Sequence, residues 1–296
     1  MKSNIFLNDI TVVDHAFIDH KGRVMGGSFH PSFIVEGSVD DVEKVVVDFS
    51  TIKKEIKYQI DKHLHNIDRN GFDHKLWIIE GFSNAEMELL DNDGDRYKIV
   101  TPLCTLNLPA DAIKFISKLN EHPLHTTGYT AEYIGLAFEQ FLEEQLSGVY
   151  SNIDIKVKCF NDINMHRIRR TEPYDIFSYS HGLKDSTSYG CQNIAHGHLS
   201  FFQHKEWSVV EEVVDDLDGA IFINKENIIE ENDNEIQIKY ESQRGLFMAT
   251  YSKQGNKIIV LDTETTIEYI AEYIKSKYNV HDFFVSEGLS KGAYVA

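Results

Sequence analysis

Cysteine is scarce in this sequence. Cys104, Cys159 and Cys191 are the only three in 296 residues, and their odd number and wide spacing argue against a disulfide framework. Long hydrophobic runs are also missing, because the longest, such as 45–47 and 258–261, are strand-sized and fall short of the roughly 20 residues of a membrane helix. The N-terminal MKSNIFLNDI lacks the apolar core of a signal peptide. These absences predict a cytoplasmic protein with no membrane partner.

Basic residues are too few to balance the acidic ones. Lys and Arg number 29 against 47 Asp and Glu, which gives a formal net charge of −18 at pH 7. Because a surface that binds nucleic acid carries an excess of basic residues, we expect no nucleic-acid partner. An anionic small molecule is still compatible with a local basic pocket. The hydrophobic fraction of 42% is that of a packed globular protein.

Two segments resemble each other faintly, at 128–134 and 265–270. Each begins with threonine, a good N-cap, and places a glutamate in the first turn of an amphipathic pattern. A β-rich segment follows each predicted helix, at 153–159 and at 280–285. The chain is therefore predicted to contain two related halves, with a boundary near Arg170.

Strand-like segments open each half, and the pattern predicts an α+β fold with domains at 1–170 and 171–296. An acidic stretch is predicted to be an exposed loop, and a Gly-containing turn after it to close a hairpin. The predicted elements are strands at 11–17, 32–36, 44–49, 176–181 and 196–203, a helix from Thr51 to about Leu64, a loop at 230–235 and a hairpin turn at 253–256.

The most specific pattern is a set of three histidines around one cysteine. His196 and His198 are two residues apart, so on a strand both imidazoles point to the same side. If the strand that carries His181 pairs with theirs as a hairpin, it supplies a third nitrogen. Three imidazoles and an open position are typical of catalytic zinc, whereas structural zinc has four protein ligands. Cys191 is then a nearby base rather than a ligand.

An alternative interpretation of this pattern stays open. A His-x-His pair is common in proteins that bind no metal. Likewise, Asp73-His74 alone is explained by a histidine that follows a helix and interacts favourably with its dipole. Cys104 and Cys159 are predicted to be small core residues.

The motifs together resemble the 6-pyruvoyl-tetrahydropterin synthase and 6-carboxytetrahydropterin synthase family. The pattern F-S-x-x-H, then C, then H-G-H in the second half is similar to the zinc and cysteine motif of that family. Other segments of this chain resemble its strand-to-helix segment, its Leu-Asp-His-Lys motif, its Pro-Thr-Ala-Glu helix start and its glutamate strand. These segments are 45–54, Phe72-Asp73-His74-Lys75, Tyr129-Thr130-Ala131-Glu132 and Val285-Ser286-Glu287.

The resemblance has informative departures. The first half shows Ser28-Phe29-His30 where the family has H-G-H, so no zinc is expected there, and Asn161 or a neighbour stands where the pterin-anchoring Glu falls. The second half shows Leu217-Asp218-Gly219 where the family has Leu-Asp-His. Each half thus lacks what the other retains, which predicts one composite site.

The resemblance implies a fold, a substrate and residue roles. The fold is a tandem tunnelling fold (T-fold), with antiparallel sheets, helices packed on one face and an oligomeric barrel that makes the protein a homo-oligomer. The substrate is a pterin triphosphate, 7,8-dihydroneopterin triphosphate. The implied roles are zinc binding by His181, His196 and His198, proton transfer by Cys191, orientation of the acid/base His74 by Asp73, and pterin binding by Glu287.

The implied enzyme is a zinc-dependent carbon–oxygen lyase of the 6-pyruvoyl type or a 6-carboxytetrahydropterin synthase, in pterin or 7-deazaguanine (queuosine) biosynthesis. Alternatives are a bimodular tunnelling-fold nitrile reductase, although its helical Glu-Ser-Lys-Ser signature is not found, and a non-catalytic pterin- or purine-binding protein. For Arg167, Arg169 and Arg170 a solvated strand face is favoured over triphosphate binding.

Overall fold

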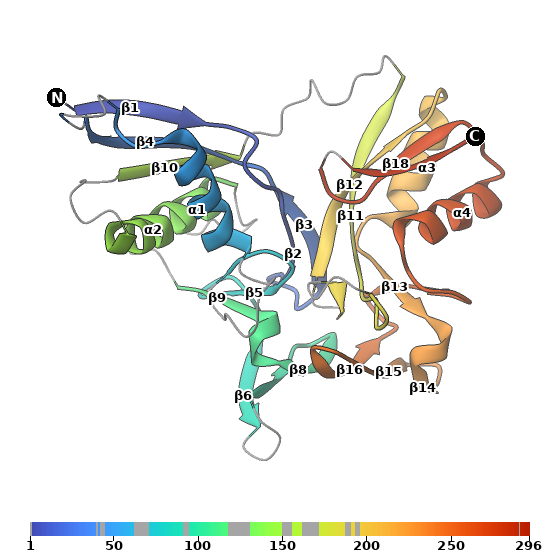
Figure 1. The fold of residues 1–296 in the computed structure, drawn as a ribbon. Coiled ribbons are helices and arrows are strands. Elements are labelled where there is room, and N and C mark those ends of the chain that lie inside the picture. The colour runs from blue at the N-terminus through green and yellow to red at the C-terminus, as the bar shows by residue number, and fades with distance from the viewer. Residues whose placement is uncertain are drawn as a thin grey trace.

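The computed structural model describes residues 2–39, 41, 45–61, 71–90, 95–117, 131–149, 156–161, 172–186, 191–192, 196–289 and 291–296. Strands and helices are mixed along this part of the chain, which confirms the α+β class (Figure 1). No helix within these ranges is long and apolar enough to cross a membrane.

The N-terminal half, up to residue 161, places two helices against its strands. One sheet has the order β1 (Lys2–Leu7), β4 (Pro31–Ser38), β10 (Lys156–Asn161), and the other the order β3 (Val24–Phe29), β2 (Val13–Ile18), β5 (Leu76–Ile79), β9 (Ile113–Ile116). Buried residues of α1 (Phe49–Asp61) and α2 (Ala131–Val149), such as Ile56 and Phe138, join strand residues in one core cluster.

The C-terminal half, from residue 172, has a single six-stranded sheet with two helices packed on it. Its sheet has the order β17 (Lys257–Leu261), β13 (Ala220–Asn224), β11 (Tyr174–His181), β12 (His196–Gln203), β18 (Phe283–Ser286), β19 (Gly292–Val295). Helices α3 (Trp207–Leu217) and α4 (Ile267–Tyr278) cover it, and Val213 and Ile270 pack into the same cluster as Phe177.

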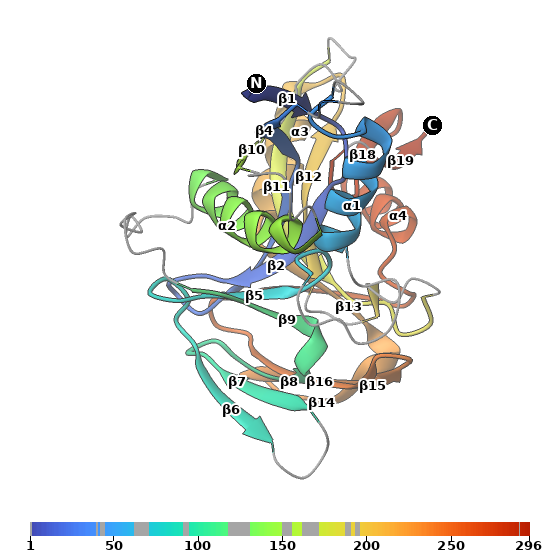
Figure 2. The same cartoon turned by 60° about the vertical axis from the view of Figure 1, so that its left-hand side comes forward.

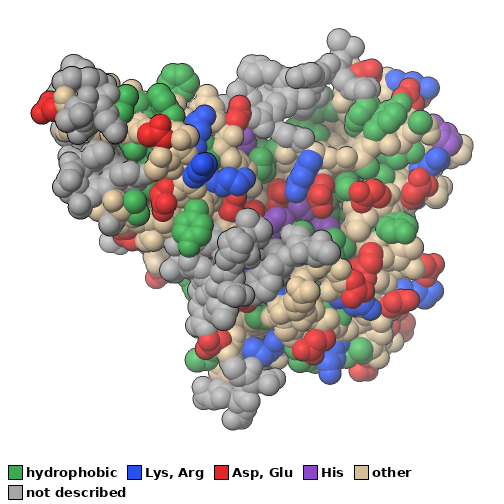
Figure 3. Space-filling model, viewed as in Figure 1, with side chains coloured by type: hydrophobic (Ala, Val, Ile, Leu, Met, Phe, Trp, Pro, Cys, Tyr) green, Lys and Arg blue, Asp and Glu red, His purple; other side chains and the backbone are tan. Residues whose placement is uncertain are grey.

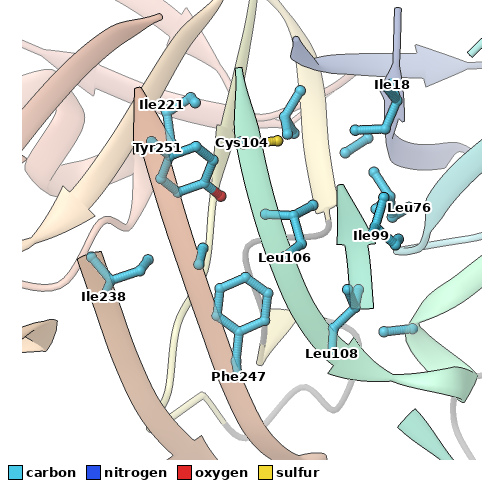
Figure 4. Packing of buried hydrophobic residues seen from close by; sticks show 14 of the residues in the cluster. Ile18, Leu76, Ile99, Cys104, Leu106, Leu108, Ile221, Ile238, Phe247 and Tyr251 are labelled. Carbon is cyan, nitrogen blue, oxygen red and sulfur yellow. The ribbon is translucent and has the colours of Figure 1, made fainter. Parts of the chain in front are cut away.

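A further sheet joins the halves. Its order is β14 (Ile228–Glu231), β15 (Glu235–Ser242), β16 (Gly245–Ser252), β8 (Cys104–Pro109), β7 (Arg96–Val100), β6 (Glu86–Leu90), as Figure 2 shows below the helices. Short 3-10 turns lie beside it, η1 (Ala110–Ala112) and η4 (Lys225–Asn227). Its inner face packs against both halves in one core, where Leu76 and Ile221 meet Leu106 and Tyr251 (Figure 4).

The hairpins β2–β3 and β11–β12 have matching backbone contacts. Asp14 N–H donates to Asp73 Oδ1 and Asp14 O accepts from His74 N–H, while Ser178 makes the same pair of bonds with Asp218 and Gly219. The registers of the two hairpins extend this match along the strands. The positions of His181, His196 and His198 then correspond to Phe17, Met25 and Gly27. The sequence-based alignment of Ser28-Phe29-His30 with H-G-H was therefore wrong, although the apolar counterparts likewise offer no imidazoles.

The two hairpins pack against each other (Figure 1), and a glycine of each lies at the closest approach of their backbones. A Cβ added to Gly26 would lie 1.9 Å from Tyr179 O, and one added to Gly197 would lie 2.5 Å from Gly26 Cα. Such distances leave no room for a side chain, because the clash is with backbone that cannot rotate away. The close approach brings the β2–β3 hairpin up against the histidine-bearing strands.

Several predicted elements need correction. The sheets are not purely antiparallel, because β2–β5, β5–β9, β11–β13 and β13–β17 pair in parallel. Residues 45–47 form bends rather than a strand, and α1 begins at Phe49, two residues before the predicted start; its predicted end near Leu64 lies outside the described residues. The turn at 253–256 closes no hairpin: β15 pairs with β16 through the turn Gln243-Arg244, whereas β17 pairs with β13.

Other predicted elements agree with the structure or lie outside its described residues. The hairpin of the histidine strands is present, and Thr266 is the N-cap residue of α4, although its side chain makes no capping hydrogen bond. The proposed boundary near Arg170 and the helix-start residues Tyr129 and Thr130 lie outside the described residues.

Candidate metal centre and acid/base dyad

Three imidazoles meet at the end of the β11–β12 hairpin. His181 pairs directly with His196 in the antiparallel register, and His198 lies two residues further along the same face of β12. The Nε2 atom of His198 is 3.1 Å from that of His181 and 3.0 Å from that of His196. All three side chains are fully buried. The predicted hairpin thus brings together the three histidines named from the sequence.

The spacing of these nitrogens fits a metal ion. Zinc binds imidazole nitrogen at about 2.0–2.1 Å, so two ligands of a tetrahedral ion are about 3.3 Å apart. His181 Nδ1 lies 2.5 Å from the Thr265 carbonyl oxygen, and since a carbonyl only accepts, Nδ1 carries the proton and the Nε2 lone pair faces the cluster. Burial lowers the pKa of His181 to about 3. The ring is therefore neutral at neutral pH, the form that binds metals.

Asp14, on β2 of the other half, lies behind the cluster. Its Oδ1 is 3.4 Å from His198 Nδ1, and its Oδ2 is 3.5 Å from Lys291 Nζ. Ser28 Oγ also donates to this carboxylate. Burial tends to raise the pKa of Asp14, but the opposing charges of His198 and Lys291 outweigh it and hold the pKa below its usual range. A carboxylate on the outer nitrogen of a metal-binding histidine orients the ring and raises its basicity.

Asp14 is not among the site residues predicted from the sequence. A local signal exists, since an aspartate followed by a histidine interrupts the apolar strand Val12-Val13-Asp14-His15-Ala16. That signal marks a buried polar residue without identifying its partner, which comes from a segment 184 positions away in the chain (198 − 14).

Cys191 faces His74 across the contact between the two halves. Cys191 Sγ is 3.9 Å from His74 Nδ1, and His74 Nε2 is 3.6 Å from Asp73 Oδ2. His74 adopts a left-handed backbone conformation with φ of 50°, and its N–H donates to Asp14 O. The Asp-His pair of one half therefore reaches the cysteine of the other within a single chain.

The electrostatics around Asp73 differ from those around Asp14. Burial, followed by the charges of Asp14 and Asp61, raises the pKa of Asp73 well above its usual range. A cation bound nearby would favour the ionised form of this carboxyl group, because bound metals are the largest local charges in a site.

Arg244 contacts the segments that carry Cys191 and His74, which together form the acid/base dyad. It lies in the turn between β15 and β16, and its side chain is only 1% exposed. Its Nη1 donates to His74 O at 3.3 Å and its Nη2 to Asp111 O at 2.8 Å. Its backbone N–H donates to the side chain of Gln192, the neighbour of Cys191. One turn of the joining sheet therefore contacts both sides of the dyad.

Glu287 lies at the rim of the cluster. Its Oε1 is 3.9 Å from His198 Nε2, its Oε2 is 3.8 Å from Lys291 Nζ, and its side chain is 22% exposed. Figure 3 shows histidine side chains in a hollow near the middle of this face, beside acidic and basic ones. Of the remaining named residues, Cys104 is a buried core residue, while Arg167, Arg169, Arg170 and the Cys159 side chain lie outside what is described.

No protein-family model matches the chain, and no curated protein matches it either. Solved structures of 6-pyruvoyltetrahydropterin synthases are similar over about half of it. A catalytic residue mutant of the Plasmodium vivax enzyme is 17% identical, with 54% of this chain and 92% of that chain covered and a TM-score of 0.37. A second P. vivax structure is 16% identical, with 54% and 99% covered and a TM-score of 0.36.

The synthase from Plasmodium falciparum is 15% identical, with 53% of this chain and 98% of that chain covered and a TM-score of 0.33. Such similarities define neither a substrate nor an activity for this chain.

Proposed function

We propose that this protein is a zinc-dependent 6-pyruvoyl- or 6-carboxy-tetrahydropterin synthase-like enzyme that acts on 7,8-dihydroneopterin triphosphate. One observation carries the proposal: three buried imidazoles with converging Nε2 atoms lie beside a cysteine that faces a histidine-carboxylate pair. A Lewis-acid position next to a paired base and acid is what removal of triphosphate and rearrangement of the side chain require.

The metal belongs on His181, His196 and His198, where a bound zinc ion supplies charge stabilisation to the oxygens of the substrate side chain. Cys191 takes a proton from a side-chain carbon of the substrate. Asp73 lies beside Nε2 of His74 and favours a proton on Nε2. Nδ1 of His74 is then unprotonated and accepts the thiol proton. The same pair then returns protons to the rearranged side chain, so that both groups act as acid and base in turn.

Glu287 is proposed to bind the pterin ring. A carboxylate accepts two parallel hydrogen bonds from an amino group and the adjacent ring N–H of a planar heterocycle. The exposed part of Glu287 and its position beside the imidazoles support this role, since the ring would then project its side chain toward the metal position.

The matching hairpin contacts support a tandem tunnelling fold, with domains at 1–170 and 171–296 and one composite site. We further propose a cytoplasmic homo-oligomer in pterin or 7-deazaguanine biosynthesis. These statements rest on the resemblance of the motifs as well as on the contacts.

The test is turnover of the proposed substrate. The full-length protein with one equivalent of zinc is incubated with 7,8-dihydroneopterin triphosphate, and products are identified by mass spectrometry. We expect loss of triphosphate and a tetrahydropterin product, with Cys191→Ala retaining zinc and losing the rate by about 10²–10⁴-fold. Cys104→Ala, at a buried thiol outside the site, serves as the matched control. Unchanged substrate with zinc-loaded wild type would contradict the proposal.

A further inference from the structure

A second group of metal-binding side chains adjoins the three imidazoles. His74, Cys191 and His196 each present a ligand atom, and these atoms lie within 4.8 Å of one another. His196 belongs to both groups, and its ring centroid is 4.9 Å from that of His74. The two candidate positions are therefore neighbours that share a residue.

The spacing of the new group suits a soft cation. A tetrahedral zinc ion with a thiolate at about 2.3 Å and an imidazole at about 2.0–2.1 Å separates sulfur and nitrogen by about 3.6 Å. Cys191 Sγ and His74 Nδ1 are 3.9 Å apart. Thiolate and imidazole are the donors that zinc, cadmium and cobalt prefer over oxygen ligands, so small shifts of the side chains complete the geometry.

His74 is oriented as a metal ligand would be. Its Nε2 lies 3.6 Å from the Asp73 carboxylate, which leaves Nδ1 directed at the sulfur. The same relation holds between Asp14 and His198 in the first group. A carboxylate behind the outer nitrogen is the usual support of a metal-bound histidine, and with Glu287 three carboxylates contact the imidazoles of the two groups.

We propose that His74, Cys191 and His196 form a second metal position, for a soft divalent cation, that fills after the three-imidazole position. It is weaker because its atoms are further apart, because Cys191 is only partly buried, and because two dications at such short range repel each other. Occupation joins the metal to Cys191 Sγ and to the ring nitrogen of His196 that the first ion leaves unused; the thiol proton and the proton of that nitrogen go to solvent, so that His196 serves both ions as an imidazolate, without a change of oxidation state. The cation therefore withdraws the thiol from proton transfer and inhibits the enzyme; this inhibition rests on the proposed function, whereas the binding does not.

Cobalt distinguishes the two positions by spectrum. Metal-free full-length protein is titrated with Co²⁺ while absorption is recorded. The first equivalent should give visible bands without a thiolate-to-cobalt charge-transfer band, and the second equivalent should add that near-ultraviolet band. Cys191→Ser should abolish it and His74→Ala should weaken it, with the visible bands of the first equivalent intact as proof of folding. The double variant Cys104→Ser, Cys159→Ser should keep it.

Two results would overturn the proposal. A charge-transfer band complete at the first equivalent would make Cys191 a ligand of the main centre, and no band at excess cobalt, with normal visible bands, would mean that no thiolate position exists. In the turnover assay, zinc beyond one equivalent should lower the wild-type rate by about 10²-fold or more. If there is no turnover even at one equivalent, the proposed function fails, while the cobalt spectra still decide the second position.

Discussion

Asp14 connects two segments that are far apart in the sequence through a single carboxylate. It accepts from Ser28 Oγ on the neighbouring strand, and it faces His198 and Lys291 in the C-terminal half. A Cβ on Gly288, whose φ is 68°, would lie 2.2 Å from Asp14 Oδ1, so the chain passes closely over this carboxylate. Asp14 therefore belongs to the support of the imidazole cluster rather than to the surface of either half.

Replacing this carboxylate should weaken metal binding. We expect Asp14→Asn to lower zinc affinity by about 10–100-fold, because the outer nitrogen of His198 loses its charged partner while the shape of the side chain is kept. Competition with a chromogenic chelator measures the affinity. Asp218→Asn, at a carboxylate that accepts from the backbone of β11 instead of facing an imidazole, should bind zinc as the wild type does; equal losses in the two variants would assign Asp14 a general structural role.

Asp73 should make stability depend on pH in an unusual direction. Its folded pKa is raised by burial and by Asp14 and Asp61, so above about pH 3.9 the unfolded state ionises first and stability falls as pH rises toward the folded pKa. Asp73→Asn cannot ionise, and its stability relative to the wild type should increase with pH in this window. Urea denaturation of the metal-free proteins at several pH values measures the difference.

Asp48 is a control for Asp73, because its pKa is shifted in the opposite direction. Its pKa is lowered to about 2, chiefly by hydrogen bonds from Ser50 and Thr51 at the start of α1. Its contribution to stability is therefore present above the unfolded pKa and lost as pH falls toward 2. Asp48→Asn should lose stability relative to the wild type as pH rises from about 2 to 4. Parallel profiles for the two variants would contradict the assignment of Asp73.

At the scale of elements, the turn between β15 and β16 links the joining sheet to the dyad. Arg244 contributes side-chain bonds to the backbone of the segment carrying His74, and its backbone N–H contacts Gln192 beside Cys191. The sheet otherwise packs in the core between the halves. Arg244 is therefore a positioning residue, which fixes the distance between sulfur and imidazole without touching either reacting atom.

Removing the guanidinium of Arg244 should loosen the packing between Cys191 and His74. Arg244→Met removes charge-assisted bonds worth about 1.5–3 kcal/mol each and leaves Asp111 without the guanidinium. We expect lower stability in urea, a slower iodoacetamide alkylation of Cys191, and a fall in kcat with zinc affinity kept. Arg96→Met is the matched control, because Arg96 is a buried arginine of the same sheet whose side chain donates to Asn107. An unchanged alkylation rate in Arg244→Met would refute the positioning role.

Elements with a local signal could be predicted from sequence, and those selected by distant partners could not. The alternation around His196 and His198 predicted their strand, and the α4 pattern predicted a helix. Val46 and Val47 looked like a strand but pack into the core as bends before the Asp48 cap. Gly255 does mark a turn, but β16 pairs with β8 and β17 with β13, and that choice depends on contacts more than 100 residues apart in the first case (248 − 107).

The candidate site likewise contains residues that local motifs predict and residues that only distant contacts bring in. The three histidines, Cys191, Asp73 and His74 came from motifs, and the structure places them together. Asp14 and Arg244 reach the site from β2 and from the β15–β16 turn. Only the packing of the hairpins and the shared core bring them there, so no spacing in the sequence could indicate them.

At the scale of the whole molecule, the halves share their interior. Residues from both, including Ile18, Ile99, Ile223 and Phe247, belong to one buried cluster. Separation of the halves would expose this surface and the edges of β8 and β16, which pair with each other. Each half has a buried cluster of its own, but when isolated it would leave its share of this joint cluster exposed to water.

We expect segments 1–170 and 171–296 to fail to fold when they are produced separately. Each should lack a cooperative urea transition by circular dichroism, because burial of apolar surface supplies the main driving force for folding. When refolded together they should recover the transition and bind zinc. A cooperative transition in either isolated segment would show that the shared core is dispensable.

The mismatch between His181, His196, His198 and their counterparts Phe17, Met25, Gly27 also bears on how this site can change over generations. In an assembly of identical subunits, every substitution is copied into each site and must suit all the roles that one sequence performs. Here the two sides of the site are encoded at separate places in one gene. A mutation beside Cys191 leaves the sequence around His74 untouched, so selection can act on the base and on its partner independently.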